Sequence, residues 1–222
     1  MIPLAGPAEI QSQAGLSTYP GATAGRRRTV RLQLRDATAD VHEALHRHPA
    51  FVSLLEGRIA LPTYRALLAR LHGFHTALER DLRDASPEIL RGFDVRALER
   101  SPDLRADLLA LGLSDRDIEA LPVCEGLRSV RSNAELMGRL YVVEGSALGG
   151  RVLAARLDGL LGPAGTAGRR FFTGRAAPDP LPWPAFCRLL EAQAADVEAV
   201  IEGADTTFHA MADWLAGSDA HG

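Results

Sequence analysis

Three glycines interrupt an otherwise regular helical pattern in residues 140–150, which read LYVVEGSALGG. A glycine inside a helix costs roughly 1 kcal/mol relative to alanine, so three of them in one helix require a reason. Gly145 and Gly149 are four residues apart and share a helical face, and Ser146 and Gly150 repeat this spacing one residue on. Such small residues let a backbone lie flat against either a broad ligand or another helix, and the spacing alone favours neither.

The apolar residues on both sides of this stretch recur at helical spacing. They predict one long helix over residues 133–161, which Gly162 and Pro163 end. They also predict a first helix from Leu32 to Pro49, a long helix from about residue 61 to 82, and the last helices over about 184–214. Between about 86 and 130 the sequence indicates short helices and turns, with Ser114 as a helix cap.

Alternating apolar and polar residues, the pattern of a strand, never extend over a useful length. We therefore predict an all-α protein of seven or eight helices, with one domain over residues 29–218. Residues 1–28 are rich in small and polar residues without apolar periodicity, and they predict a disordered N-terminal tail.

The composition is that of a globular chain of 222 residues, 46% of them hydrophobic. The 25 basic and 28 acidic residues are interspersed, so we expect no nucleic-acid partner. No apolar run approaches the roughly 20 residues that a membrane span needs, so we expect no membrane partner either. Two cysteines give no disulfide framework, which fits a cytoplasmic location.

His42 is the first candidate for chemistry. It follows Val41 in the helical stretch from Leu34 to Leu45. Imidazole is a usual ligand where iron must react with oxygen. Taken alone, however, a histidine with a satisfied hydrogen bond in the core or at the surface is the simpler interpretation of one among seven histidines.

Together the two stretches resemble the heme oxygenase family, and the resemblance extends over about residues 31–215. Residues 34–42 resemble the family's proximal helix, in which a histidine follows a Thr-x-x-Val stretch. Residues 145–150 resemble its distal helix, in which glycines bend the backbone over the heme. The amino-acid sequence of this stretch is more similar to bacterial than to animal members. The resemblance implies the single-domain helical fold of that family, with heme as both cofactor and substrate.

The resemblance also implies a function for several residues. His42 would be the axial ligand of the heme iron, and Gly145, Ser146 and Gly149 would form the reacting side of the pocket. Gly150 and Tyr141 would contact the heme, although packing in the core explains Tyr141 equally well. Arg35 lies two helical turns before His42, where the family has a basic residue that pairs with a heme propionate. Arg188 matches a second basic position of the family.

Two positions depart from the family pattern. Many members have an aspartate directly after the first distal glycine, where it organises the water that delivers protons, and here Ser146 takes that place. Animal members have a carboxylate four residues after the proximal histidine, and here that position is His46. His42 and His46 could also face one metal ion in a non-heme site. We assign none of the histidines other than His42 to the heme iron.

The family reaction opens the porphyrin ring with O2 and yields biliverdin, carbon monoxide and ferrous iron. The sequence contains no nucleotide-binding loop, so the electrons would come from a separate ferredoxin or reductase. A photoreceptor that uses biliverdin is a further expected partner. Two alternatives stay open: a heme carrier or sensor on the same fold, which Ser146 favours, and a helical protein without heme, in which the glycines only pack.

Overall fold

A computed structural model of the chain describes residues 28–91, 93–163, 165–175 and 179–217. These ranges contain helices and no strand, so the all-α prediction is confirmed. Apart from Arg28, the expected N-terminal tail lies outside the described residues. The α-helices are α2 (Val30–Ala37), α3 (Ala39–His46), α4 (Pro49–Leu55), α5 (Leu61–Asp84), α6 (Pro87–Leu90), α7 (Ser101–Ala110), α8 (Asp115–Glu119), α9 (Asn133–Arg156), α10 (Asp158–Leu161), α11 (Arg170–Thr173), α12 (Trp183–Glu191) and α13 (Val197–Ala216). One 3-10 helix, η1 (Val95–Leu98), precedes α7 in the described part of the chain.

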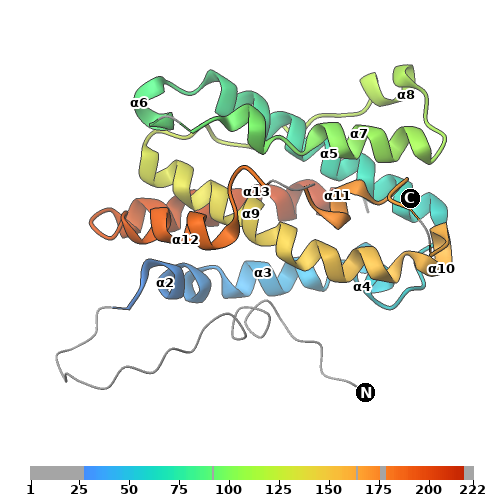
Figure 1. Cartoon of the computed structure of the whole chain (residues 1–222), viewed down its shortest axis with the longest axis horizontal. Coiled ribbons are helices and arrows are strands. Elements are labelled where there is room, and N and C mark those ends of the chain that lie inside the picture. The colour runs from blue at the N-terminus through green and yellow to red at the C-terminus, as the bar shows by residue number, and fades with distance from the viewer. Residues whose placement is uncertain (1–27, 92, 164, 176–178, 218–222) are drawn as a thin grey trace.

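Helices α9 and α13 form the centre of the fold and make its most extensive helix pair. Figure 1 shows α2, α3 and α4 along one side of this pair, with α6, α7 and α8 along the opposite side. The long helix α5 packs on α7, α4 and α13. Thus α13 contacts both the N-terminal helices and α9, and this arrangement positions the candidate site described below.

Two glycines allow α9 and α13 to approach closely. A side chain at Gly138 of α9 would collide with the Val200 carbonyl and lie 2.7 Å from the amide nitrogen of Ala204. A side chain at Gly203 of α13 would lie 2.7 Å from the Cα of Glu135. The local sequence does not mark these two glycines, because glycine is needed there for a contact between distant parts of the chain.

The N-terminal helical stretch is divided in two, where the sequence predicted one helix. The Thr38 hydroxyl donates to the Leu34 carbonyl one turn earlier, at 2.8 Å, and Thr38 separates α2 from α3. A threonine bond of this kind competes with the backbone pattern and bends helices. Pro49 also differs from expectation: α3 already ends at His46, and Pro49 starts α4, where its missing N–H costs nothing.

The prediction of seven or eight helices was too low, since the described residues form twelve α-helices. The difference comes from short helices of four or five residues, such as α6 and α11, whose periodicity is too brief to detect. The long predicted helix at 133–161 ends at Arg156, and α10 follows after one residue. The cap at Ser114 is confirmed, because its hydroxyl accepts from the amide of Asp117 in a capping box.

Buried carboxylates hold the helices on the α5 and α7 side together. Glu79 of α5 accepts hydrogen bonds from the backbone amides of Arg100 and Ser101, at 2.6 and 2.8 Å. Asp107 of α7 accepts from the amides of Arg170 and Phe171 at the start of α11, at 2.7 and 2.9 Å. Each bond satisfies a helix-end donor that would otherwise be buried without a partner.

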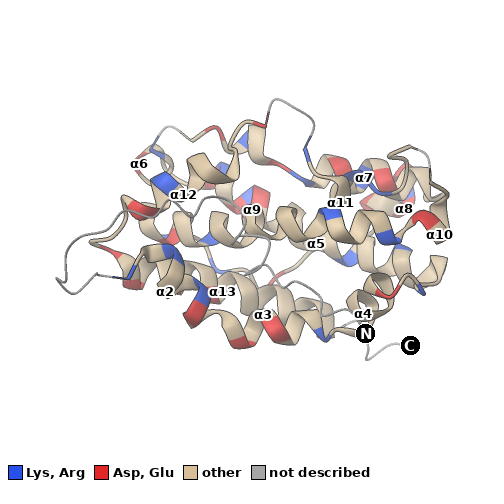
Figure 2. Ribbon diagram, turned by 60° about the horizontal axis from the view of Figure 1, so that its bottom comes forward, with Lys and Arg blue, Asp and Glu red and all other residues tan. Residues whose placement is uncertain are grey.

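The surface carries both signs of charge, and Figure 2 shows basic and acidic residues interspersed along most helices. None of the described helices combines the length and the hydropathy that crossing a membrane requires.

Candidate functional site

His42 lies half-buried on α3, with aromatic groups around its ring. The edge of the Phe208 ring, from α13, meets it at a centroid distance of 5.8 Å. The imidazole of His46, one turn further along α3 and exposed, lies 4.4 Å away between centroids. The Nε2 atoms of the two histidines are 3.2 Å apart.

The environment of His42 favours the neutral imidazole. Burial lowers the pKa of His42, the nearby His46 lowers it further, and Glu43 acts in the opposite direction. A neutral ring keeps a lone pair on nitrogen, which is the form that binds a metal. The residues present therefore fit a histidine-ligated iron.

The second half of α9 has open space beside two of its glycines. A side chain at Gly149 would meet no atom within 4 Å, although Gly149 lies within a helix and is half-buried. A side chain at Gly145 would meet only the Trp183 ring, at 3.6 Å, which is ordinary van der Waals contact. Neighbouring helices thus do not require glycine at these two positions, unlike at Gly138.

Gly150 has a different environment, because its missing side chain faces α11. A Cβ there would lie 3.0 Å from the Phe172 carbonyl oxygen and 3.4 Å from the Phe172 Cα. Close packing of α9 on α11 therefore explains why residue 150 is a glycine. The contact of Gly150 with heme stays a prediction.

Helices α3 and α9 share α13 as a packing partner. In Figure 1 α3 and α9 run along neighbouring levels of the molecule, with α13 behind α9. His42 on α3 and the glycines Gly145 and Gly149 on α9 therefore lie on two helices that both pack against α13. A ligand bound between α3 and α9 would need the two helices to be held in place in this way.

Ser146 and Tyr141 differ in exposure. The Ser146 side chain is exposed, and its hydroxyl donates to the Val143 carbonyl at 2.8 Å, so its lone pairs remain available to accept from water. Tyr141 is buried, and its ring lies 5.8 Å from that of Trp183. Burial raises the pKa of Tyr141, while the charges of Arg31 and Arg35 act against this shift.

Arg35 and Arg188 lie on neighbouring helices, because α12 packs against α2. Both are exposed, and Arg35 forms an ion pair with Asp36 at 3.3 Å. Glu191 of α12 accepts hydrogen bonds from the backbone amides of Val30 and Arg31, at 2.9 and 3.1 Å, which fixes α12 to the start of α2. An anionic group that pairs with Arg35 would share this guanidinium with Asp36.

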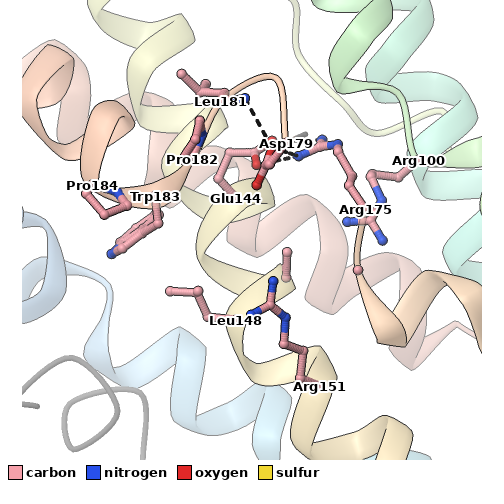
Figure 3. A pocket seen from close by; sticks show the side chains of 12 residues that line it. Arg100, Glu144, Leu148, Arg151, Arg175, Asp179, Leu181, Pro182, Trp183 and Pro184 are labelled. Atoms are coloured by element: carbon pink, nitrogen blue, oxygen red, sulfur yellow. Dashed lines mark hydrogen bonds and ion pairs between the residues drawn. The ribbon is translucent and has the colours of Figure 1, made fainter. Parts of the chain in front are cut away.

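A pocket of about 250 Å³ lies beside the glycine face of α9 (Figure 3). Glu144, Leu148 and Arg151 line it from α9, and Trp183, which also lies against the Gly145 position, lines it from α12. Glu144 accepts from both terminal nitrogens of Arg175, at 2.6 and 3.0 Å. None of the described residues that line this pocket is a histidine, so they offer no imidazole ligand for iron.

Trp183 and Phe208 belong to the candidate site, although the sequence analysis did not select them. Trp183 lies against Gly145 and Tyr141, and Phe208 against His42. Phe208 follows Val200 and Ala204 at helical spacing, so its pattern predicts only a core position. No local signal marks either residue, because both reach the site through long-range packing.

Comparison with known proteins identifies the family of the chain. The family model described as heme oxygenase matches residues 28–217. A curated heme oxygenase from Xanthomonas campestris pv. campestris is 32% identical over 169 residues, covering 76% of this chain and 89% of that protein.

Two solved structures share the fold. Heme oxygenase-1 from the cyanobacterium Synechocystis, in complex with heme, has a TM-score of 0.66 at 17% identity and covers 87% of this chain and 93% of its own. The heme oxygenase from Leptospira interrogans has a TM-score of 0.65 at 16% identity and covers 86% of this chain and 100% of its own. The family match over most of the chain, together with the curated relative, shows that this chain belongs to the heme oxygenase family.

Proposed function

We propose that this chain binds heme between α3 and α9, with His42 as the axial ligand, and oxidises it to biliverdin, carbon monoxide and ferrous iron. The observation that carries the proposal is the neutral, half-buried His42 on α3 together with the open backbone at Gly145 and Gly149 on α9. Heme supplies both the iron that reacts with O2 and the porphyrin ring that is oxidised. Electrons come from a separate ferredoxin or reductase.

The residues of the chain have separate functions in this proposal. Nε2 of His42 binds the iron, so the contact between His42 and His46 gives way when heme enters. Phe208 limits rotation of the His42 ring through its edge contact. Arg35 and Arg188, exposed on adjacent helices, pair with the anionic propionates at the mouth of the pocket.

On the α9 side, the glycines leave room that a larger side chain would fill. Trp183 closes this space at one end, because its ring already touches the position of a Gly145 side chain. Ser146 accepts a hydrogen bond from water, while its own proton is directed to the Val143 carbonyl. Water held in this way supplies protons to the reacting oxygen without a carboxylate.

The test is to mix the purified chain with heme, a reductant and O2, and to follow the absorption spectrum. Loss of the Soret band with growth of a broad red absorption, and biliverdin in the extract, is the expected result. A stable spectrum of an oxygenated heme complex would instead identify a carrier or sensor, which is the alternative that Ser146 favours because it replaces the family's usual acid.

A further inference from the structure

His42 and His46 form a pair that the proposed reaction does not use. They are four residues apart on α3, so successive turns place both rings on the same face of the helix. Their Nε2 atoms approach to 3.2 Å, with the ring planes inclined by 48°. At this distance one ring N–H donates to the other ring nitrogen, so a metal ion that binds both nitrogens would take the place of that hydrogen.

This separation, which is that of a hydrogen bond in the metal-free chain, also lies in the range that a metal ion imposes on two imidazole ligands. Zinc binds histidine nitrogen at about 2.0–2.1 Å, and nitrogens at that distance are roughly 2.9–3.4 Å apart for right-angled to tetrahedral coordination. Imidazole suits zinc, nickel and copper among the divalent cations, and affinity rises toward nickel and copper. The pair therefore has the donor type and the spacing of a chelate for such an ion.

The rest of the site allows a metal to enter. His46 is exposed, so one side of the pair is open to water. The described residues contain no group of three or more histidine, cysteine or acidic side chains placed to hold a metal. The described residues would thus supply two ligands to an ion, and water would complete its coordination.

We propose that the heme-free chain binds one divalent late-transition ion, of the nickel, copper or zinc type, between Nε2 of His42 and Nε2 of His46. Because the same atom of His42 would bind the heme iron, the ion and heme exclude each other. Metal binding stands on the geometry of the pair alone, whereas the exclusion rests on the proposed function.

The first experiment titrates the heme-free, tag-free full-length chain with Ni²⁺ in a calorimeter, after treatment with a chelator. Wild type is expected to bind about one ion per chain, and His42→Ala and His46→Ala each to weaken binding at least about tenfold. His209→Ala is the matched control: His209 is exposed and pairs with Asp205 at 3.3 Å, and its removal is expected to leave binding unchanged. Wild-type affinity in His46→Ala would overturn the proposal.

The second experiment titrates heme with and without saturating Ni²⁺ and follows the Soret band. Wild type is expected to bind heme more weakly when Ni²⁺ is present, whereas His46→Ala binds heme equally in both conditions. Equal weakening by Ni²⁺ in wild type and His46→Ala would overturn the exclusion. Failure of heme to bind at all would contradict the proposed function and leave the first experiment as the test of the metal site.

Discussion

Helix α9 carries Gly138 in its first half and Gly145 and Gly149 in its second half, and the surroundings of these glycines differ. At Gly138 an added side chain would collide with the backbone of α13, whereas at Gly149 it would meet no atom within 4 Å. The first half of the helix thus needs glycine to pack against protein. In the second half, no neighbouring protein atom requires glycine at Gly145 or Gly149, as the proposed heme site needs, while Gly150 packs closely on α11.

The largest effect is expected at Gly138. Gly138→Ala forces a methyl group into the backbone of α13, and we expect it to lower the free energy of unfolding by about 3 kcal/mol or more. Denaturant unfolding followed by circular dichroism measures this change.

Gly149→Ala is the matched variant on the same helix. It gains helix propensity without a clash, so its stability should stay equal or rise by up to about 1 kcal/mol. Equal destabilisation by both alanines would remove the distinction between the two halves of α9.

Larger side chains test the open space directly. Gly149→Leu should weaken heme binding at least about tenfold and leave helix content nearly intact, because leucine occupies space that no protein atom fills. A heme titration followed by absorption measures the affinity. Gly159→Leu is the control, since Gly159 also has nothing within 4 Å but lies on α10. If Gly149→Leu binds heme as tightly as Gly159→Leu does, the open face of α9 is not the heme site.

His75, on α5, should make the free energy of unfolding depend on pH. Burial, together with the positive charges of Arg100 and Arg175, lowers the pKa of His75 to about 3. Below pH 6.5 the unfolded chain binds a proton at His75 and the folded chain does not, so the contribution of His75 to folding stability should fall as the pH falls from 6.5 toward 3.

Replacing this histidine separates its contribution from that of other groups. His75→Gln cannot take up a proton, so between pH 6.5 and 4 its free energy of unfolding should fall less steeply than that of wild type. Urea unfolding at several pH values measures the two slopes. Parallel curves for the two proteins would show that His75 titrates alike in the folded and unfolded chain.

The smallest effect is expected at Ser146. Ser146→Ala should slow biliverdin formation by less than about tenfold, because the backbone carbonyls around Gly145 still hold water. Ser146→Asp should be tolerated, since the hydroxyl and the carboxylate both accept from water. The measurement is biliverdin formed per heme in a single turnover. If only Ser146→Asp forms biliverdin, the wild-type chain is a heme carrier.

The sequence was sufficient to predict the helical class, the long stripe of α5 and the cap at Ser114, because each depends on local periodicity or on hydrogen bonds a few residues apart. It did not predict the break at Thr38, where one buried hydroxyl bond divides a regular apolar pattern. For the site, the spacing around residue 145 indicated a flat contact surface. The surroundings of Gly138, Trp183 and Phe208 depend on contacts between distant segments, so no single stretch of sequence could reveal them.

The most direct test of His42 as the iron ligand is the iron–imidazole stretching band in the resonance Raman spectrum of the ferrous heme complex. We expect this band in wild type and in His46→Ala, and its loss in His42→Ala with recovery when imidazole is added. A band that persists in His42→Ala and disappears in His46→Ala would contradict this assignment, because the heme iron would then be held by His46.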